Sequence, residues 1–287
     1  MTTADKVAEA KNELKEWIDK SDTKDFYFDQ AILKINEKLA ESKVPKSIIV
    51  SFASLLDNWY SNNFVYDLLT KEATTFKIDT VANGYHILKI ADILADQFPA
   101  NPPKLLFDKA AYWLANCLSE KWYKESEELT LIINKGLATN FLKGGLDFKP
   151  AAWFILEIAN KGFKNTVDYS KFNYPADMGV YKEALDNWNT IDMGLLDSIL
   201  SKLCDFHLEN ATYGDEEDTA GIQFGSAKEF VYTFEILAWL SIRERAGLKN
   251  PDNYSHPLLN LTLNKLPVVA SNRPKDELFD KIIEKLK

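Results

Sequence analysis

Apolar residues recur every three or four positions through most of the chain, which is the period of an amphipathic α-helix. The first such segment, residues 3–20, places Val7, Ala10, Leu14 and Trp17 on one side. Convincing period-two alternation, the mark of a half-buried β-strand, is found nowhere along the chain. The pattern therefore predicts an all-α protein of about a dozen helices.

The expected helices follow one another with short connections, which is typical of stacked antiparallel helical hairpins. After residues 3–20 we expect a turn at 25–28, and then further helices. Their expected ranges are 29–40, 45–61, 64–72, 79–95, 106–117, 124–141, 151–161 (with Gly162 closing it), 177–188, 192–210, 226–246 and 275–287. The tryptophans of these helices fall at unequal intervals, so no regular repeat is predicted.

The clearest break in the first half is the proline-rich segment Pro99–Pro103. Prolines at this density mark a loop, and such a loop could divide the chain into two domains. Five residues is also an ordinary length for a connection between two packed helices. We therefore expect residues 1–287 to form a single all-helical domain, with a subdivision near 99–103 as the alternative.

The stretch of residues 226–267 is expected to organise the fold. Ser226 and Glu229 have the spacing of a capping box, which predicts a helix that begins there. The apolar arc that follows is wide, as in a helix covered on more than one side. Gly247 suits the left-handed position just after a helix, and the apolar residues between the later prolines predict a tail packed on the body.

The same stretch carries a recognisable sequence pattern. The helix reads Glu-Ile-Leu-Ala-Trp-Leu and ends in Arg-Glu-x-Ala-Gly, and an Asn-Pro pair, a His-Pro-Leu motif and a final Leu-Pro follow. The residues that mark this pattern are Glu235, Trp239, Arg243, Gly247, His256 and Pro257. It resembles the C-terminal part of helical immunity proteins from bacterial polymorphic-toxin and type VI secretion antagonism systems. The resemblance covers about the last third of the chain.

The resemblance implies a protein–protein interaction inhibitor. Such a protein neutralises its cognate toxin by stoichiometric contact, and it is not an enzyme and needs no cofactor or metal. The net charge of −9 agrees with a basic toxin surface as partner and argues against nucleic acid or an anionic membrane. The N-terminus lacks the features of a signal peptide and no apolar run could span a membrane, so we expect a cytoplasmic protein.

An acidic segment is the strongest local feature, because no lysine or arginine lies between Lys202 and Lys228. We expect its exposed side chains to contact the partner, since clustered carboxylates speed association with a basic surface and fix its register. The expected contact residues are Asp205, Glu209, Tyr213, Asp215, Glu216, Glu217 and Asp218. The alternative is a solvated acidic loop without a partner. A Ca²⁺ site is disfavoured because the carboxylates are adjacent and lack the order of an EF-hand.

Two other hypotheses about the function remain open. A helical hydrolase-like enzyme would have a carboxylate and histidine site built on Asp192, Asp205 and His207, although no motif for a nucleophile, metal or nucleotide is present. A helical adaptor or scaffold would share the acidic surface but bind another basic partner. Cys117 and Cys204 are expected to be buried thiols, and the loop aromatics near residues 165–175 could anchor a partner.

Overall fold

The structure is a computed structural model that describes residues 2–71, 73–144, 146–212 and 222–287. Packed helices dominate the described residues, and the strands contribute two short pieces of two residues each. The prediction of an all-α fold is confirmed. Helical periodicity was a sufficient guide because most of the apolar positions are buried in one core.

The elements follow in chain order, and two π-helical segments, Asp25–Asp29 and Ser51–Leu56, extend the second and third helices. The α-helices are α1 (Thr3–Asp19), α2 (Gln30–Ala40), α3 (Ile48–Val50), α4 (Asp57–Thr70), α5 (Phe76–Gln97), α6 (Phe107–Ser119), α7 (Tyr123–Ala138), α8 (Pro150–Phe163), α9 (Val180–Asp186), α10 (Met193–Glu209), α11 (Phe234–Arg245) and α12 (Glu277–Leu286). The strands β1 (Leu105–Leu106) and β2 (Leu142–Lys143) pair in parallel, with Leu105 opposite Leu142.

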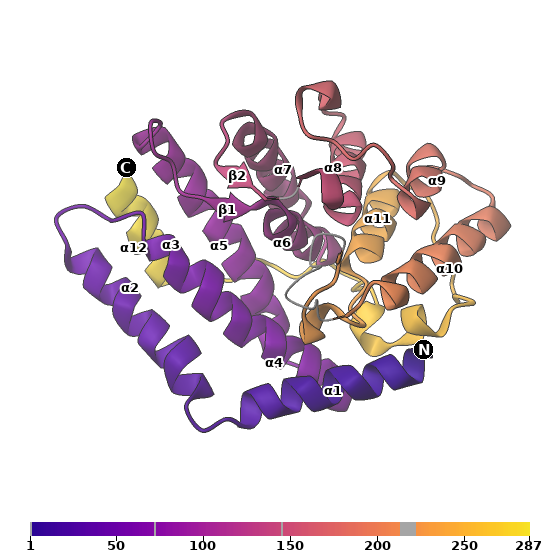
Figure 1. The fold of residues 1–287 in the computed structure, drawn as a ribbon, viewed down its shortest axis with the longest axis horizontal. Coiled ribbons are helices and arrows are strands. Elements are labelled where there is room, and N and C mark those ends of the chain that lie inside the picture. Colours follow the sequence, from indigo (N-terminus) through magenta and orange to yellow (C-terminus); the bar gives the residue numbers. More distant parts are fainter. Residues whose placement is uncertain (1, 72, 145, 213–221) are drawn as a thin grey trace.

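Helix α6 lies in the middle of the molecule and contacts α5, α7, α8 and α11 (Figure 1). On one side α2, α4, α5 and α12 form a layer, and on the other side α8, α9, α10 and α11 gather around the second half of the chain. Helix α1 runs along the edge and packs on α4. Helices before and after the proline-rich segment, α5 and α6, therefore pack directly on each other.

Helix α11 is covered on all sides, as its wide apolar arc predicts, and every residue from Phe234 to Arg243 is buried. Its close neighbour is α8, where a Cβ atom at Gly162 would lie 2.7 Å from Ile242. The expectation that Gly162 closes α8 is wrong. The helix continues to Phe163, and Lys164 takes the left-handed conformation with φ of 61°. Gly162 instead allows the two helices to approach closely.

The start of α11 differs from the prediction, whereas its end agrees with it. Ser226 makes no capping hydrogen bond, and residues Ala227–Glu229 form only a 3-10 turn before α11 begins at Phe234. The side chain of Glu229 forms a buried ion pair and so does not cap the helix. At the other end Gly247 has φ of 76°, and the amide of Leu248 donates to the Arg243 carbonyl, which completes a Schellman motif.

Two expected interruptions of the N-terminal helices are wrong. Residues 48–70 are helical without a break, although we expected an end at residues 61–63. Ser61 and Asn63 do not terminate the helix because their side chains donate to the carbonyls of Asp57 and Trp59, one turn earlier. The turn expected at residues 25–28 is part of the π-helical segment.

The C-terminal tail packs on the body, as predicted. Leu258, Leu259 and Leu263 are fully buried, and Asn264 receives a hydrogen bond from the amide of Thr233. His256 accepts a hydrogen bond from the amide of Leu258 through Nδ1 at 3.2 Å. The His-Pro-Leu motif therefore fixes the tail against the start of α11.

Cys117 and Cys204 are free and buried, which confirms their expected placement. Burial raises the pKa of both thiols, and nearby carboxylates add to this effect. Both sulfurs are therefore held in the protonated form, which is a poor nucleophile.

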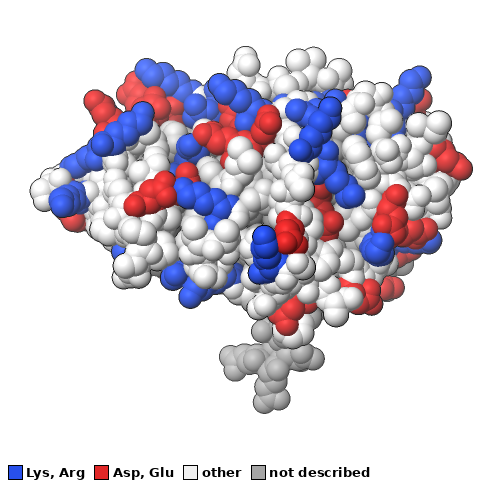
Figure 2. All heavy atoms as spheres, turned by 90° about the horizontal axis from the view of Figure 1, so that it is seen from above, with Lys and Arg blue, Asp and Glu red and all other residues white. Residues whose placement is uncertain are grey.

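The surface of the described residues carries charges of both signs. On the face seen in Figure 2, lysines and arginines are interspersed with aspartates and glutamates. The helices of the described residues include none that is long and apolar enough to cross a bilayer.

Candidate partner-binding site

Within the acidic segment, the residues on either side of 213–221 are held together at one place on the body. Ala211, just after α10, forms a parallel β-bridge with Phe224. Both residues are fully buried. The segment between them contains Tyr213, Asp215, Glu216, Glu217 and Asp218, all of which lie outside the described residues. We call Ala211, Ile222, Gln223 and Phe224 the base of the acidic segment.

Polar contacts from two other parts of the chain hold this base. Lys6 of α1 donates to the Ala211 carbonyl, and Lys149 donates to the Ile222 carbonyl at 2.9 Å. Gln223 donates through Nε2 to the Phe148 carbonyl at 2.8 Å. Lys6 is only 1% exposed, so its bond to Ala211 is shielded from water. The base is thus fixed by α1 and by the residues around the start of α8.

Two of the expected contact residues lie on the surface of α10, next to the base. Asp205 and Glu209 are one helical turn apart and both are exposed. The Asp205 carboxylate lies 3.3 Å from Nε2 of His256, which connects α10 to the tail. These two carboxylates therefore continue the acidic character of the segment onto a rigid helix.

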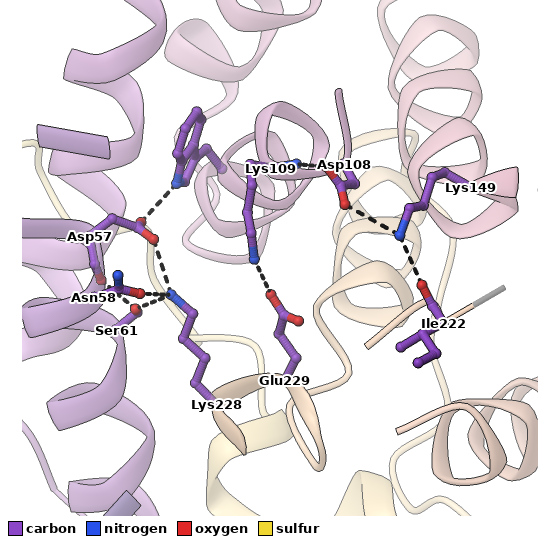
Figure 3. A network of polar contacts seen from close by, with 10 residues as sticks. Asp57, Asn58, Ser61, Asp108, Lys109, Lys149, Ile222, Lys228 and Glu229 are labelled. Atoms are coloured by element: carbon purple, nitrogen blue, oxygen red, sulfur yellow. Dashed lines mark hydrogen bonds and ion pairs between the residues drawn. The ribbon is translucent and has the colours of Figure 1, made fainter. Parts of the chain in front are cut away.

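Beneath the base lies a network of buried charged side chains (Figure 3). Lys228 Nζ is 3.0 Å from Asp57 Oδ2 and donates to the hydroxyl of Ser61 at 2.7 Å. The other carboxylate oxygen of Asp57 accepts a hydrogen bond of 2.8 Å from the indole of Trp113. Both charged residues are almost fully buried, so the pair ties the turn before α11 to α4 in a water-poor environment.

A second pair extends this network toward the base. Lys109 Nζ lies 2.7 Å from Glu229, and Lys149 Nζ lies 3.5 Å from Asp108 while it also binds Ile222 (Figure 3). Burial alone would lower the pKa of Lys109, but the charge and hydrogen bond of Glu229 outweigh it and raise that pKa. Burial would raise the pKa of Glu229, and Lys109 and Lys228 outweigh it and lower it. Both members therefore stay charged.

His207 joins α10 to the same region. Its Nδ1 is 2.8 Å from Glu235 and its Nε2 is 2.8 Å from the Glu229 carbonyl. The ring stacks on Phe224 of the base with centroids 3.9 Å apart. Both ring nitrogens are thus engaged in the interior, so His207 and Glu235 stabilise the base and are not presented to a ligand.

A cavity of about 250 Å³ opens beside the base. Its charged lining consists of Asp108, Lys109, Lys149 and Glu229, and these groups are paired with one another. An activated lysine nucleophile needs a lowered pKa, whereas the pKa of Lys109 is raised. The arrangement holds the wall of the cavity and the base in place but does not activate Lys109 as a nucleophile.

The residues proposed for an enzymatic site are not brought together. Asp192 caps the N-terminus of α10 and accepts hydrogen bonds from the amides of Gly194 and Leu195. Asp205 lies thirteen residues further along the same helix, which places it roughly 20 Å away at 1.5 Å per residue. His207 is completely buried. The three side chains therefore share no common surface.

The remaining residues of the sequence pattern have structural roles. Arg243 is buried and donates to the carbonyls of Trp188, Thr190 and Lys249, and Trp239 donates to the Trp188 carbonyl. They brace the connection between α9 and α10 from within. Arg243 therefore faces inward and also braces the loop that follows its own helix.

The aromatic residues of the 165–175 loop also turn inward. Tyr169, Phe172 and Tyr174 surround Trp153 of α8, with ring centroids 5.9, 6.1 and 5.2 Å from it. Their rings cover part of the core and are only partly buried, so their role as anchors for a partner stays a prediction.

The sequence reading missed the buried network of Asp57, Lys109, Lys149 and Lys228. A signal existed for one of them, since Asp57 follows the apolar pair Leu55-Leu56 and precedes Trp59 on a helix. A charge on an apolar stripe predicts a buried partner, but it does not identify which residue supplies it.

Comparisons with protein-family models, with curated proteins and with solved structures found no match to the chain.

Proposed function

We propose that this protein is an immunity protein that neutralises a cognate antibacterial toxin by stoichiometric contact through its acidic segment. The toxin surface in this proposal is basic, and the protein acts in the cytoplasm without catalysis or a cofactor. The resemblance of the C-terminal third to helical immunity proteins supplies the biological setting. The structural observation that carries the proposal is the fixed base of the acidic segment.

The fixed base supports the proposal because it limits the conformational entropy that the acidic segment would lose on binding a toxin. The ends of the segment are joined by the Ala211–Phe224 bridge and held by Lys6 and Lys149. Fixing the residues on both sides of a contact segment reduces the conformational entropy lost when a partner binds. The buried ion pairs beneath the base resist displacement, since separating such a pair leaves an uncompensated charge.

The negative charge of the acidic segment also supports its proposed role in binding a basic toxin. No lysine or arginine lies between Lys202 and Lys228, and within this stretch Asp205 and Glu209 are two exposed carboxylates on α10. A concentrated negative surface accelerates encounter with a basic partner and disfavours acidic ones. The adaptor alternative uses the same surface, and it differs only in the identity of the partner.

The test is co-expression with a candidate toxin, sought among the proteins encoded next to this gene. The wild-type protein is expected to restore growth of toxin-expressing bacteria and to form a stoichiometric complex in size-exclusion chromatography. The double variant Glu216→Lys, Glu217→Lys is expected to lose protection. Its matched control is Glu37→Lys, Glu41→Lys, which makes the same charge change at exposed positions around the end of α2.

Full protection by the Glu216→Lys, Glu217→Lys protein would remove the acidic segment from the proposal. A wild-type protein that neither binds nor protects against that candidate toxin would overturn the immunity function itself. Stoichiometric binding to a different basic protein, without protection, would favour the adaptor alternative.

A further inference from the structure

A second cavity lies far from the acidic segment, where the C-terminal helix meets α5. It has a volume of about 310 Å³ and is lined by α2, by the continuous helical segment of residues 48–70, by α5 and by residues 274–278 around the start of α12. Its apolar lining includes Ile32, Phe52 and Leu56. The volume is at the lower end of the range found for small-molecule sites.

One face of α5 supplies most of the polar lining. Asp79, Asn83 and His86 are spaced by four and three residues, so they lie on the same side of the helix. Tyr60 faces them from α4, and Asp276 faces them from the N-terminus of α12. A cavity with an apolar wall and a small number of converging polar groups has the composition of a ligand site.

His86 is the buried polar group that the fold leaves incompletely satisfied. It is 2% exposed, its Nδ1 lies 3.3 Å from Asp276 Oδ2, and its Nε2 has no hydrogen-bond partner among the described residues. The ring stacks on Phe279 of α12 at 3.8 Å. A buried imidazole nitrogen without a partner is costly, so a bound molecule that satisfies it would be favoured.

The charge of the cavity is negative and poorly compensated. Asp79 makes no ion pair or hydrogen bond within the described part of the chain, and burial together with repulsion from Asp276 raises its pKa. Burial and these same two carboxylates also raise the pKa of Tyr60. Arg273, the cation nearby in sequence, is directed to Glu125 and to the ring of Tyr85. Lys275 reaches the lining but is exposed.

We propose that this cavity binds a small primary amine as its ammonium ion. The ammonium group would lie between Asp79 and Asp276, and its three N–H groups match a site rich in acceptors. A short alkyl chain would contact Ile32, Phe52 and Leu56. A metal ion fits less well, because no cluster of three or more His, Cys, Asp or Glu ligands is formed among residues 2–71, 73–144, 146–212 and 222–287.

The experiment is isothermal titration calorimetry of the full chain with n-butylamine, together with n-butanol and butyrate as neutral and anionic probes of similar size. Saturable binding of n-butylamine alone is expected. Asp79→Asn and Asp276→Asn are each expected to weaken it by about tenfold, since each removes one charge-assisted contact. Asparagine is as good an N-cap as aspartate, so Asp276→Asn keeps α12 capped.

The matched control is Asp280→Asn, which removes an exposed carboxylate of α12 outside the cavity and is expected to leave the affinity unchanged. Lys275→Ala removes a competing ammonium group and is expected to maintain or tighten binding. A shift of the His86 Nε2 resonance on addition of n-butylamine, measured by ¹⁵N NMR, would place the ligand in the cavity.

Three results would overturn the proposal. The first is the absence of saturable n-butylamine binding to the wild-type protein. The second is equal affinity in the Asp79→Asn and Asp276→Asn proteins when circular dichroism shows that both are folded. The third is binding of Mg²⁺ or Zn²⁺ that depends on Asp79 and Asp276 while n-butylamine does not bind, which would reassign the cavity to a metal ion.

Discussion

Lys228 and Asp57 are separated by 171 positions in the sequence, and their side chains form a buried ion pair of 3.0 Å. The pair joins the turn that precedes α11 to the first turn of α4. It lies directly beside the Lys109–Glu229 pair, and together they support the base of the acidic segment (Figure 3). The interior charges and the proposed partner surface are therefore parts of one arrangement.

Because the Lys228–Asp57 pair is buried, removal of one of its two charged side chains is expected to lower stability strongly. Lys228→Met leaves the Asp57 carboxylate buried without its counter-charge, so the free energy of unfolding is expected to fall by about 3 to 5 kcal/mol in urea titration. The matched control is Lys182→Met, which breaks an exposed pair with Asp186 and is expected to cost at most about 1 kcal/mol. Equal losses in the two variants would show that burial of the first pair has no energetic weight.

The close approach of α8 and α11 predicts that Gly162 cannot be enlarged. Gly162→Ala places a methyl group 2.7 Å from the Ile242 side chain, and overpacking of this kind is expected to lower stability by about 1 to 3 kcal/mol. The second change Ile242→Val removes part of the clash and is expected to recover some of the loss in thermal unfolding. A stable Gly162→Ala protein would mean that the two helices separate easily.

His86 predicts a pH dependence of stability. Burial, with a contribution from Arg273, lowers the pKa of His86 from 6.5 to about 3. The unfolded chain therefore binds a proton at this residue between pH 6.5 and about 3 while the folded chain does not. Stability from this residue is fully present above pH 6.5 and is lost as the pH falls, by at most about 1.4 kcal/mol per pH unit.

The measurement is urea unfolding of the wild-type and His86→Gln proteins at several values between pH 4 and 7. The wild-type protein is expected to lose stability more steeply with acid than the variant. Parallel curves for the two proteins would show that His86 titrates normally in the fold.

The contacts of Lys149 are expected to limit the local opening of the base. Lys149→Met removes the hydrogen bond to Ile222 and the ion pair with Asp108, so amide exchange of Gln223 and Phe224 is expected to accelerate. Hydrogen–deuterium exchange with mass spectrometry reports this change, with Lys182→Met as the control that alters an exposed lysine elsewhere. Unchanged protection at the base would mean that the bridge between Ala211 and Phe224 suffices to hold it.

The helices could be predicted from sequence because their apolar faces repeat with the helical period and are buried in the core. The predicted helix boundaries were wrong where a side chain makes a contact other than the one that its residue type favours locally. Ser61 and Asn63 look like helix terminators, yet they bind carbonyls of their own helix. Ser226 and Glu229 have the spacing of a capping box, yet Glu229 makes a more favourable ion pair with Lys109.

The candidate site was only partly predictable for a related reason. The exposure of Asp205 and Glu209 follows from their place on the polar face of α10. The base of the segment depends on contacts with Lys6 and Lys149, which lie far away in the sequence. The cavity beside α12 likewise requires α5 and α12 to meet, and no local pattern encodes that meeting.

The most direct test of the account is the association rate of the purified protein with the candidate toxin of the proposal as a function of salt. For the wild-type protein, we predict that the rate falls by about tenfold or more as ionic strength rises, because clustered carboxylates steer the encounter. The Glu216→Lys, Glu217→Lys protein should associate slowly at low salt, whereas the Glu37→Lys, Glu41→Lys protein should match the wild type. Identical salt dependence in all three proteins would contradict the central claim that the acidic segment makes the contact.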